Sequence, residues 1–283
     1  MKNKNFACFI LTNRKVSDIL TVNSLRRQNY TGNIYIITDD ECSYINDYKQ
    51  EYGKEFVITF SKNDIAKTFD ICDNFEGNKV IIYARNACFT IAEELGLTHF
   101  LELDDDYRSF DWRYDDDSTL RAIKINCLDD IFDYMIDYLD STNITTIAFG
   151  QAGDYIGGAG SQLFSQKIKR KVMNTFFCKV DRKFTFTGRF NEDASAYTSL
   201  GSRGNVFITI CDIGLVQRET QAASGGLTDV YKTYGTYTKS FYSVMQMPSA
   251  VRVAIMQTKH VRIHHSVDWK HCVPKIISDR FKL

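Results

Sequence analysis

The chain has 283 residues, of which 44% are hydrophobic and 25% are charged, the proportions of an ordinary folded globular protein. Its formal net charge is zero, so binding to nucleic acid would require a local basic patch rather than overall charge. The eight cysteines include no Cys-x-x-Cys pair, and no stretch approaches the roughly 18 to 20 apolar residues of a membrane-spanning helix. We therefore expect a cytoplasmic protein with reduced cysteines and one continuous fold, because no linker or repeat marks a domain boundary.

The first third of the sequence alternates predicted strands and helices. Apolar runs predict buried strands at residues 6–11, 33–38, 55–60 and 99–103. Apolar residues spaced by three and four predict a helix over residues 84–95, which Gly96 ends because glycine readily takes a positive φ. Strands separated by helices favour a parallel, doubly wound α/β sheet, in which ligands bind beyond the carboxyl ends of the strands.

The remaining sequence is less regular. Apolar residues on one face predict an amphipathic helix over residues 128–139, and apolar runs predict strands at 144–149 and 205–210. A short helix is expected to begin at Asn191, as the N-cap residue, and to end just before Gly201. We expect a nucleotide-binding α/β half followed by a mixed α+β half.

Three consecutive aspartates, Asp104, Asp105 and Asp106, follow the strand at residues 99–103. Their carboxylates repel one another, so they either lie in water as a loop or are neutralised by a cation. Hard divalent ions such as Mg²⁺ and Mn²⁺ bind carboxylates together with the oxygens of a diphosphate. A second acidic run, residues 115–117, is interpreted as a solvated turn because no predicted strand leads to it.

The stretch YARNACFTIAEELGLTHFLELDDD, residues 83–106, resembles the donor-binding signature of GT-A fold glycosyltransferases. In that family a helix that begins with Ala-Arg-Asn precedes the strand that carries the metal-binding aspartates. The resemblance implies that Asp104 contacts the ribose or the sugar and that Asp104 and Asp106 hold the metal and the donor diphosphate, with Asp105 between them. It also implies that Arg85 approaches the diphosphate or the donor sugar, a task suited to a guanidinium group.

In the same fold, the loop after the first strand normally cradles the nucleotide. Here that loop contains Thr12, Asn13 and Arg14, and Asp39 and Asp40 after the second strand are expected to close the same pocket. The alternative is that all five are ordinary polar loop residues. The implied cofactors are Mn²⁺ or Mg²⁺ and a nucleotide-sugar donor, expected to be a UDP-sugar.

Two further pairs of residues fit the family pattern. In inverting members an acidic pair supplies the general base, which here implies Glu192 and Asp193, with Asp193 favoured. Acids that favour a helix N-terminus through its dipole are the alternative reading of this pair. Many metal-dependent members also place a metal-ligating histidine near the C-terminus, which here is His264 or His265; the choice between them stays open, and a structural histidine is the alternative.

The segment from Lys167 to Arg189 is strongly basic. Eight Lys and Arg residues stand against one acid, Asp181, a local balance of +7 in a neutral chain. Basic residues mixed with aromatics suit a phosphate backbone and an exposed base, so we expect Lys169, Arg170, Lys171 and Arg189 to bind the acceptor. The alternative is a solvated helix face with core phenylalanines, which would be Phe176, Phe177, Phe184 and Phe186.

The sequence as a whole resembles the TET-associated glycosyltransferases, a GT-A group found mainly in phages. The resemblance rests on four blocks, at residues 101–110, 191–195, 225–241 and 264–276. It implies a single GT-A domain over residues 1–283, with a nucleotide-sugar-binding half at 1–110 and an acceptor-binding and catalytic half at 111–283. The implied reaction is the inverting transfer of a sugar to a hydroxymethylated pyrimidine, 5-hydroxymethylcytosine, in DNA as part of phage DNA hypermodification in the host cytoplasm.

Three other functions stay open on the sequence. The same donor site would serve a transferase that acts on a glycan or polysaccharide. Paired aspartates at a strand end are also found in metal-dependent nucleotidyltransferases, which take a nucleoside triphosphate. The third alternative is a DNA-binding module whose catalytic site has decayed.

Overall fold

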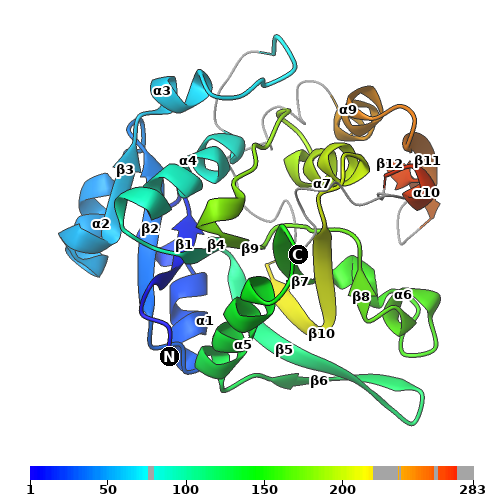
Figure 1. Cartoon of the computed structure of the whole chain (residues 1–283), viewed down its shortest axis with the longest axis horizontal. Coiled ribbons are helices and arrows are strands. Elements are labelled where there is room, and N and C mark those ends of the chain that lie inside the picture. Colours follow the sequence, from blue (N-terminus) through cyan, green and yellow to red (C-terminus); the bar gives the residue numbers. More distant parts are fainter. Residues whose placement is uncertain (76–79, 219–234, 236, 258–260, 273–283) are drawn as a thin grey trace.

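A computed structural model describes residues 1–75, 80–218, 235, 237–257 and 261–272 (Figure 1). The predicted alternation of the first part is confirmed by β1 (Phe6–Leu11), α1 (Thr21–Arg27), β2 (Asn33–Asp39), α2 (Ile45–Tyr52), β3 (Val57–Phe60), α3 (Lys62–Ala66), α4 (Ile82–Glu94) and β4 (His99–Asp104). These four strands are parallel and lie in the order β3-β2-β1-β4. This is the doubly wound α/β half that the sequence predicts.

The second part continues the same sheet with mixed strand directions. It contains β5 (Tyr107–Asp116), β6 (Thr119–Lys124), α5 (Leu128–Asp140), β7 (Thr146–Gly150), α6 (Gln162–Ser165), β8 (Ile168–Lys169), β9 (Phe176–Lys179), α7 (Glu192–Ser202) and β10 (Phe207–Gln217). In the described residues the sheet has ten strands, in the order β3-β2-β1-β4-β9-β7-β10-β5-β6, with β8 paired to β10. Strand β9 lies between β4 and β7 and pairs antiparallel with both, so it connects the two parts of the sheet.

A smaller C-terminal group of elements packs beside α7. It consists of α9 (Thr238–Gln246), β11 (Val251–Gln257), β12 (Val261–Val267) and α10 (Trp269–Cys272), and β11 and β12 form their own antiparallel sheet. Figure 1 shows these elements on the side of the molecule away from α2 and β3. The described residues contain no helix long and apolar enough to cross a membrane.

Several predicted boundaries differ from the structure. The strand predicted at 55–60 begins at Val57, because Lys54–Phe56 form a 3₁₀ turn, and Gly201 lies inside α7 rather than after it. The β5–β6 hairpin was not predicted; it projects from the sheet and carries the acidic run 115–117 at its tip (Figure 1). These aspartates are exposed, as predicted, although a strand does lead to them. The outer half of β5 and the whole of β6 are mostly exposed, so their sequence has no buried apolar face by which to find them.

The strand register positions the polar strand ends. Leu11, the last residue of β1, pairs with Asp104 on one side and with Ile37 on the other. The loop at residues 12–14 therefore leaves the sheet beside the aspartates at 104–106, and both lie next to the end of β2. Parallel neighbours whose carboxyl ends coincide form the usual ligand-binding edge of such sheets.

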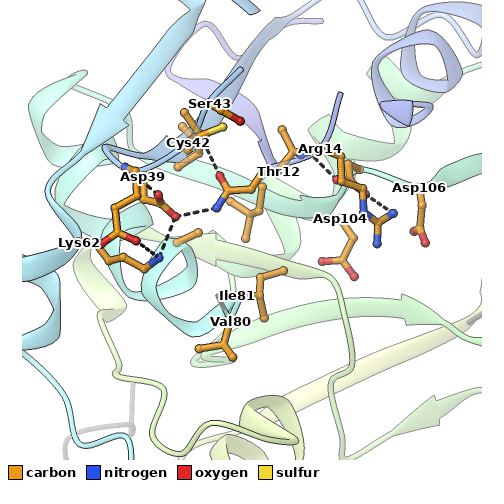
Figure 2. Close-up of a pocket in the computed structure, with 17 residues that line it drawn as sticks. Thr12, Arg14, Asp39, Cys42, Ser43, Lys62, Val80, Ile81, Asp104 and Asp106 are labelled. Atoms are coloured by element: carbon orange, nitrogen blue, oxygen red, sulfur yellow. Dashed lines mark hydrogen bonds and ion pairs between the residues drawn. The ribbon is translucent and has the colours of Figure 1, made fainter. Parts of the chain in front are cut away.

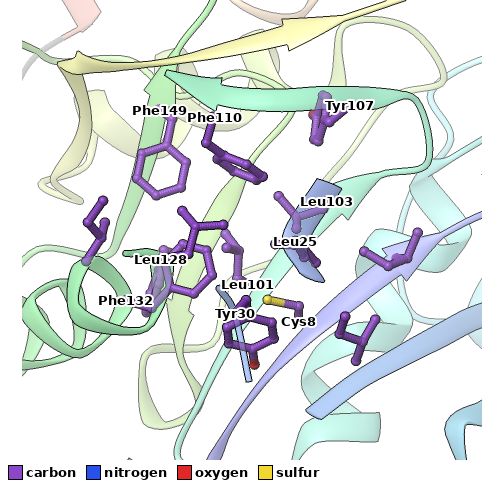
Figure 3. Close-up of a cluster of buried hydrophobic side chains, with 14 of the residues drawn as sticks. Cys8, Leu25, Tyr30, Leu101, Leu103, Tyr107, Phe110, Leu128, Phe132 and Phe149 are labelled. Carbon is purple, nitrogen blue, oxygen red and sulfur yellow. The ribbon is translucent and has the colours of Figure 1, made fainter. Parts of the chain in front are cut away.

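Aromatic side chains form the centre of the core beneath this edge (Figure 3). Phe132 of α5 is fully buried, and its ring centroid lies 5.3 to 6.3 Å from those of five other rings, Phe6, Tyr30, Phe110, Phe149 and Phe177. These partners come from four strands and the loop after α1. The core therefore fixes α5 against the strands that lead to the polar edge.

Replacing Phe132 with alanine should lower the free energy of unfolding by about 3–5 kcal/mol, because the cavity is lined by rings that cannot all move in to fill it. Chemical denaturation followed by circular dichroism measures this change. Tyr134→Ala on the same helix, where the side chain is 68% exposed, is the matched control and should change stability by no more than about 0.5 kcal/mol. Equal losses for the two variants would contradict this account of the core.

Candidate functional site

A pocket of about 330 Å³ opens at the carboxyl ends of β1, β2 and β4. It is lined by Leu11, Thr12, Asn13, Arg14, Ile37, Thr38, Asp39, Glu41, Cys42, Ser43, Lys62, Val80, Ile81, Ala84 and residues 104–106. Figure 2 shows Arg14, Asp104 and Asp106 together at one end and Asp39 and Lys62 at the other. The structure thus brings together the two loops that the sequence singled out, in a space large enough for a small molecule.

At the acidic end, Asp105 organises the loop after β1. Its Oδ2 accepts the Thr12 hydroxyl at 2.6 Å, and its Oδ1 lies 3.2 Å from a guanidinium nitrogen of Arg14. Burial raises the pKa of Asp105, while Arg14 and Thr12 act to lower it. Asp105 therefore holds the loop and Arg14 in place, while Asp104 and Asp106 on either side of it remain partly exposed to the pocket.

The opposite end of the pocket contains a lysine that the sequence analysis missed. The Lys62 ammonium is buried, 3.5 Å from Asp39 Oδ2 and 3.1 Å from Glu41 Oε2. Asp39 also accepts a 2.7 Å hydrogen bond from the Asn13 amide, whereas Asp40 binds the backbone N–H of Lys62 and does not line the pocket. Lys62 follows β3 closely, so the rule that ligands meet the carboxyl ends of strands could have found it.

Arg85 is the buried centre of charge behind the acidic end. Its Nε donates to Glu192 Oε1 at 2.9 Å, and its two terminal nitrogens lie 3.4 Å from Glu102 Oε2 and 3.3 Å from Asp104 Oδ1. The rings of Phe176 and Phe186 lie 4.8 and 5.9 Å from the guanidinium carbon. Burial lowers the pKa of Arg85, but the three carboxylates more than compensate and raise it above its ordinary value.

These contacts give Arg85 a different position from the expected one. The side chain is 1% exposed and does not line the pocket, although its neighbour Ala84 does. Arg85 contacts the pocket lining through Asp104, and it also binds α7 through Glu192. It thus links strand β4 to helix α7.

The acids around Arg85 outnumber the cation. Burial raises the pKa of Glu102 to about 8 and that of Asp104 to about 7, although Arg85 acts to lower both. Burial also raises the pKa of Asp106. The negative charge of Asp106 repels that of Asp104 and raises the pKa of Asp104 further. Two partly exposed, mutually repelling carboxylates with hard oxygen donors fit a divalent cation, because Mg²⁺ typically takes one or two carboxylates together with substrate phosphates.

The predicted histidine ligand is placed elsewhere. His264 and His265 both lie within β12, with their rings 4.4 Å apart, and the Nδ1 of His265 lies 3.4 Å from the Asn191 amide. Burial, with a contribution from Lys239, lowers the pKa of His265 to about 4, so its ring is neutral. Within the described residues no three His, Cys, Asp or Glu side chains form a metal-holding group, so the structure does not assemble a shell from Asp104, Asp106 and a histidine.

Glu192 and Asp193 begin α7, as predicted, and both are buried. Glu192 is bound to Arg85, whereas Asp193 Oδ1 accepts the backbone N–H of Ala194 at 2.7 Å. Burial raises the pKa of both carboxyls, with Arg85 acting to lower them. The two neighbouring carboxyls therefore differ in their partners: among the described residues, Glu192 forms an ion pair with Arg85, whereas Asp193 forms none.

The basic segment is largely neutralised by internal partners. Buried Asp154 lies 2.9 Å from the Lys169 ammonium and 2.5 Å from that of Lys171, and Arg189 is buried against Asp73 at 3.0 Å. Of the four residues expected to bind the acceptor, only Arg170 is exposed. The segment therefore does not present these four residues together on the surface, as their expected role in binding the acceptor would require.

The aromatic residues of that segment belong to the core. Phe176, Phe177, Phe184 and Phe186 are all buried, so the alternative reading as core phenylalanines is confirmed and they offer no stacking surface for a base. The resemblance to the family also implies that residues 228–241 line the acceptor side, but most of this stretch lies outside the described residues.

A model of glycosyltransferase sequences matches residues 6–226, which is more than half of the chain. Together with a doubly wound sheet whose strand ends form a pocket with paired aspartates, this match defines the class: the protein is a glycosyltransferase. It belongs to the TET-associated glycosyltransferase family, which is the family the model describes. The resemblance seen in the sequence is thereby confirmed.

Comparison with other proteins adds little about function. No curated protein matches the chain. The glucosyl-3-phosphoglycerate synthase of Mycobacterium tuberculosis in complex with Mn²⁺, UDP and phosphoglyceric acid is similar over 93% of this chain and 86% of its own, with a TM-score of 0.45 and 9% identity. Its complex with Mn²⁺, UDP-glucose and glycerol 3-phosphate is similar over 94% and 90%, again with a TM-score of 0.45 and 9% identity. Similarities of this size carry no argument about activity.

Asp154→Asn should lower the free energy of unfolding by about 3–5 kcal/mol at neutral pH, because it leaves two inward-facing lysines without a counter-charge. Burial raises the pKa of Asp154, but Lys171 and Lys169 pull it below its ordinary 3.8. The stability that Asp154 supplies is therefore complete above pH 3.8 and is lost as the pH falls through the lower folded-state value.

Denaturation of wild type and variant at several pH values measures this difference. Asp181→Asn, at a side chain that is 66% exposed beside Lys179, is the control and should change stability by no more than about 0.5 kcal/mol. A gap between wild type and Asp154→Asn that widens on acidification would contradict the assignment.

Proposed function

We propose that this glycosyltransferase moves a sugar from a UDP-sugar to 5-hydroxymethylcytosine in DNA, with a divalent cation and with inversion at the sugar carbon. The observation that carries the proposal is the connection through Arg85, whose guanidinium group binds both Asp104 of the pocket and Glu192 at the start of α7. A donor in the pocket and a base on α7 would thereby face the same reacting carbon. The DNA acceptor is supported by the family to which the chain belongs.

The pocket residues suit the donor. Asn13, Asp39 and Lys62 offer hydrogen-bond donors and acceptors for a base and ribose at one end. Arg14 supplies positive charge for the diphosphate at the other end, beside Asp104 and Asp106, which would hold Mn²⁺ or Mg²⁺. The bound cation would offset the charge of the leaving diphosphate.

Asp193 is the proposed general base. Its raised pKa makes it a stronger base than an exposed aspartate, and its rotamer is fixed by the hydrogen bond from Ala194. It would take the proton of the acceptor hydroxyl while that oxygen bonds to the sugar carbon and the bond to the nucleoside diphosphate breaks. Glu192 would keep its place beside Arg85 and act on the geometry of α7 rather than on the substrate.

One observation favours a glycan or polysaccharide as a second candidate acceptor. Lys169, Lys171 and Arg189 are held by Asp154 and Asp73, so the basic segment presents little free charge to a phosphate backbone. Exposed Arg170 is the member of that group proposed to contact DNA. Measurement with both kinds of acceptor decides between the two functions.

Incubation with Mn²⁺, a panel of UDP-sugars and DNA that contains 5-hydroxymethylcytosine should give a nucleoside heavier by one sugar, detected by mass spectrometry after digestion. The Asp104→Asn, Asp106→Asn double variant should lose at least about 100-fold in rate, since it removes the carboxylates that hold the ion. Asp115→Asn on the exposed hairpin is the control and should keep wild-type activity. Transfer to oligosaccharides but never to DNA would show that the acceptor is a glycan. Full activity of the double variant would contradict the proposal that Asp104 and Asp106 hold the cation.

Asp193→Asn should lower kcat by about 10² to 10⁴-fold, the usual contribution of a general base. Glu192→Gln should lower it far less, because the amide oxygen still accepts the hydrogen bond from Arg85 Nε. Initial rates at saturating donor, with melting temperatures to confirm folding, measure both effects. The reverse order of the two losses would make Glu192 the base.

A further inference from the structure

The N-terminus of α7 begins with an unusual backbone. Asn191, the N-cap residue, has φ 50° and ψ 43°, a left-handed conformation that residues other than glycine seldom adopt. An N-cap residue is normally extended, and its side chain accepts a hydrogen bond from an N–H of the first helical turn. The Asn191 side chain makes no such bond, so its conformation is explained by other contacts.

The Asn191 amide turns away from its own helix towards the C-terminal elements. Its Nδ2 donates to the Lys239 carbonyl oxygen and to the Ser243 hydroxyl, both at 2.8 Å, and lies 3.4 Å from His265 Nδ1. Lys239 and Ser243 belong to α9, and His265 belongs to β12. One side chain thus joins α7 to two further elements, through partners that lie 48 to 74 residues after Asn191 in the chain.

The next residue fixes the helix from the opposite side. Glu192 is bound to Arg85 at 2.9 Å, and Arg85 is bound to Asp104 at the pocket. Successive residues therefore hold the start of α7 to the C-terminal elements and to the donor side. Asp193 follows directly, so its position relative to both sides depends on these two attachments.

We propose that Asn191 is a positioning residue, whose amide holds the start of α7 against α9 and β12 and so sets the position of Asp193. This inference rests on the proposed role of Asp193 as the general base. It gives His265 a role beside Asn191 as part of the contact between α7 and β12. Small errors in the position of a catalytic group are costly, so loss of the amide should act on the chemical step rather than on donor binding.

Asn191→Gly tests the proposal without backbone strain, because glycine accepts a positive φ and removes only the side chain. We expect kcat, measured as UDP release from UDP-glucose or UDP-N-acetylglucosamine with 5-hydroxymethylcytosine DNA, to fall at least tenfold. The KM for the donor should stay within twofold of wild type, since the pocket residues are untouched. Asn191→Asp, which keeps the size but replaces the N–H donors with an oxygen, should show the same loss.

The matched control is Asn29→Gly. Asn29 also has a positive φ of 63°, and its amide donates to the Asn126 carbonyl oxygen, outside the site. Its substitution should leave kcat within twofold of wild type. A comparable change in melting temperature for the two glycine variants, with a loss of kcat in only one, separates positioning from general stability.

A double-mutant cycle with Asp193→Asn provides the decisive readout. If Asn191 acts through Asp193, Asn191→Gly should have no further effect on the residual rate of the Asp193→Asn enzyme. Unchanged kcat in Asn191→Gly, or an equal loss in both backgrounds, would overturn the inference. Full activity of Asp193→Asn alone would instead overturn the proposed base, and absence of transfer to DNA with UDP release intact would overturn only the acceptor.

Discussion

The structure depends on one buried guanidinium group. Arg85 is 1% exposed and bound by three carboxylates, two from β4 and one from α7. Desolvating so many charges is expensive unless each finds a partner, and removing the cation would leave carboxylates repelling one another in the interior. The planar fork of arginine can meet several carboxylates in fixed directions, which a lysine ammonium cannot do. Strand β4 and helix α7, which come from different parts of the chain, are therefore held in one arrangement.

The same group links the pocket to the helix that carries the proposed base. The pocket is built by the ends of parallel strands, whereas the proposed base lies on a helix in the mixed part of the fold. The acidic groups around Asp104 outnumber Arg85 and have raised pKa values, so a cation bound there would favour their ionised forms. The ionisable side chains that hold β4 and α7 together thus include Asp104, which also lines the pocket.

Charge counted along a sequence proved a poor guide to a surface. The segment 167–189 carries a local balance of +7, yet Lys169 and Lys171 lie on Asp154 and Arg189 lies on Asp73. Arg189 and Asp73 are 116 residues apart, so no local pattern could have paired them. The interleaved phenylalanines likewise fill the core, with Phe176 and Phe177 in β9 and Phe184 and Phe186 in the irregular segment after it. The exposed remainder of the segment is much smaller than its composition suggests.

The sequence by itself determined the four strands of the first part of the chain and the helix before the last of them, the family, and the meeting of residues 12–14 with residues 104–106 at one edge of the sheet. The strands and their shared edge follow from short-range periodicity and from the rule that parallel strands share their carboxyl ends, whereas the family follows from the resemblance of sequence blocks. Only the tertiary structure decided the partners of Arg85, the place of His265 and the left-handed turn at Asn191. Arg85 and Glu192 are 107 residues apart, and a contact over such a distance leaves no periodic signal. It arises when packing brings two charged groups out of water together, because each then needs the other as a counter-charge.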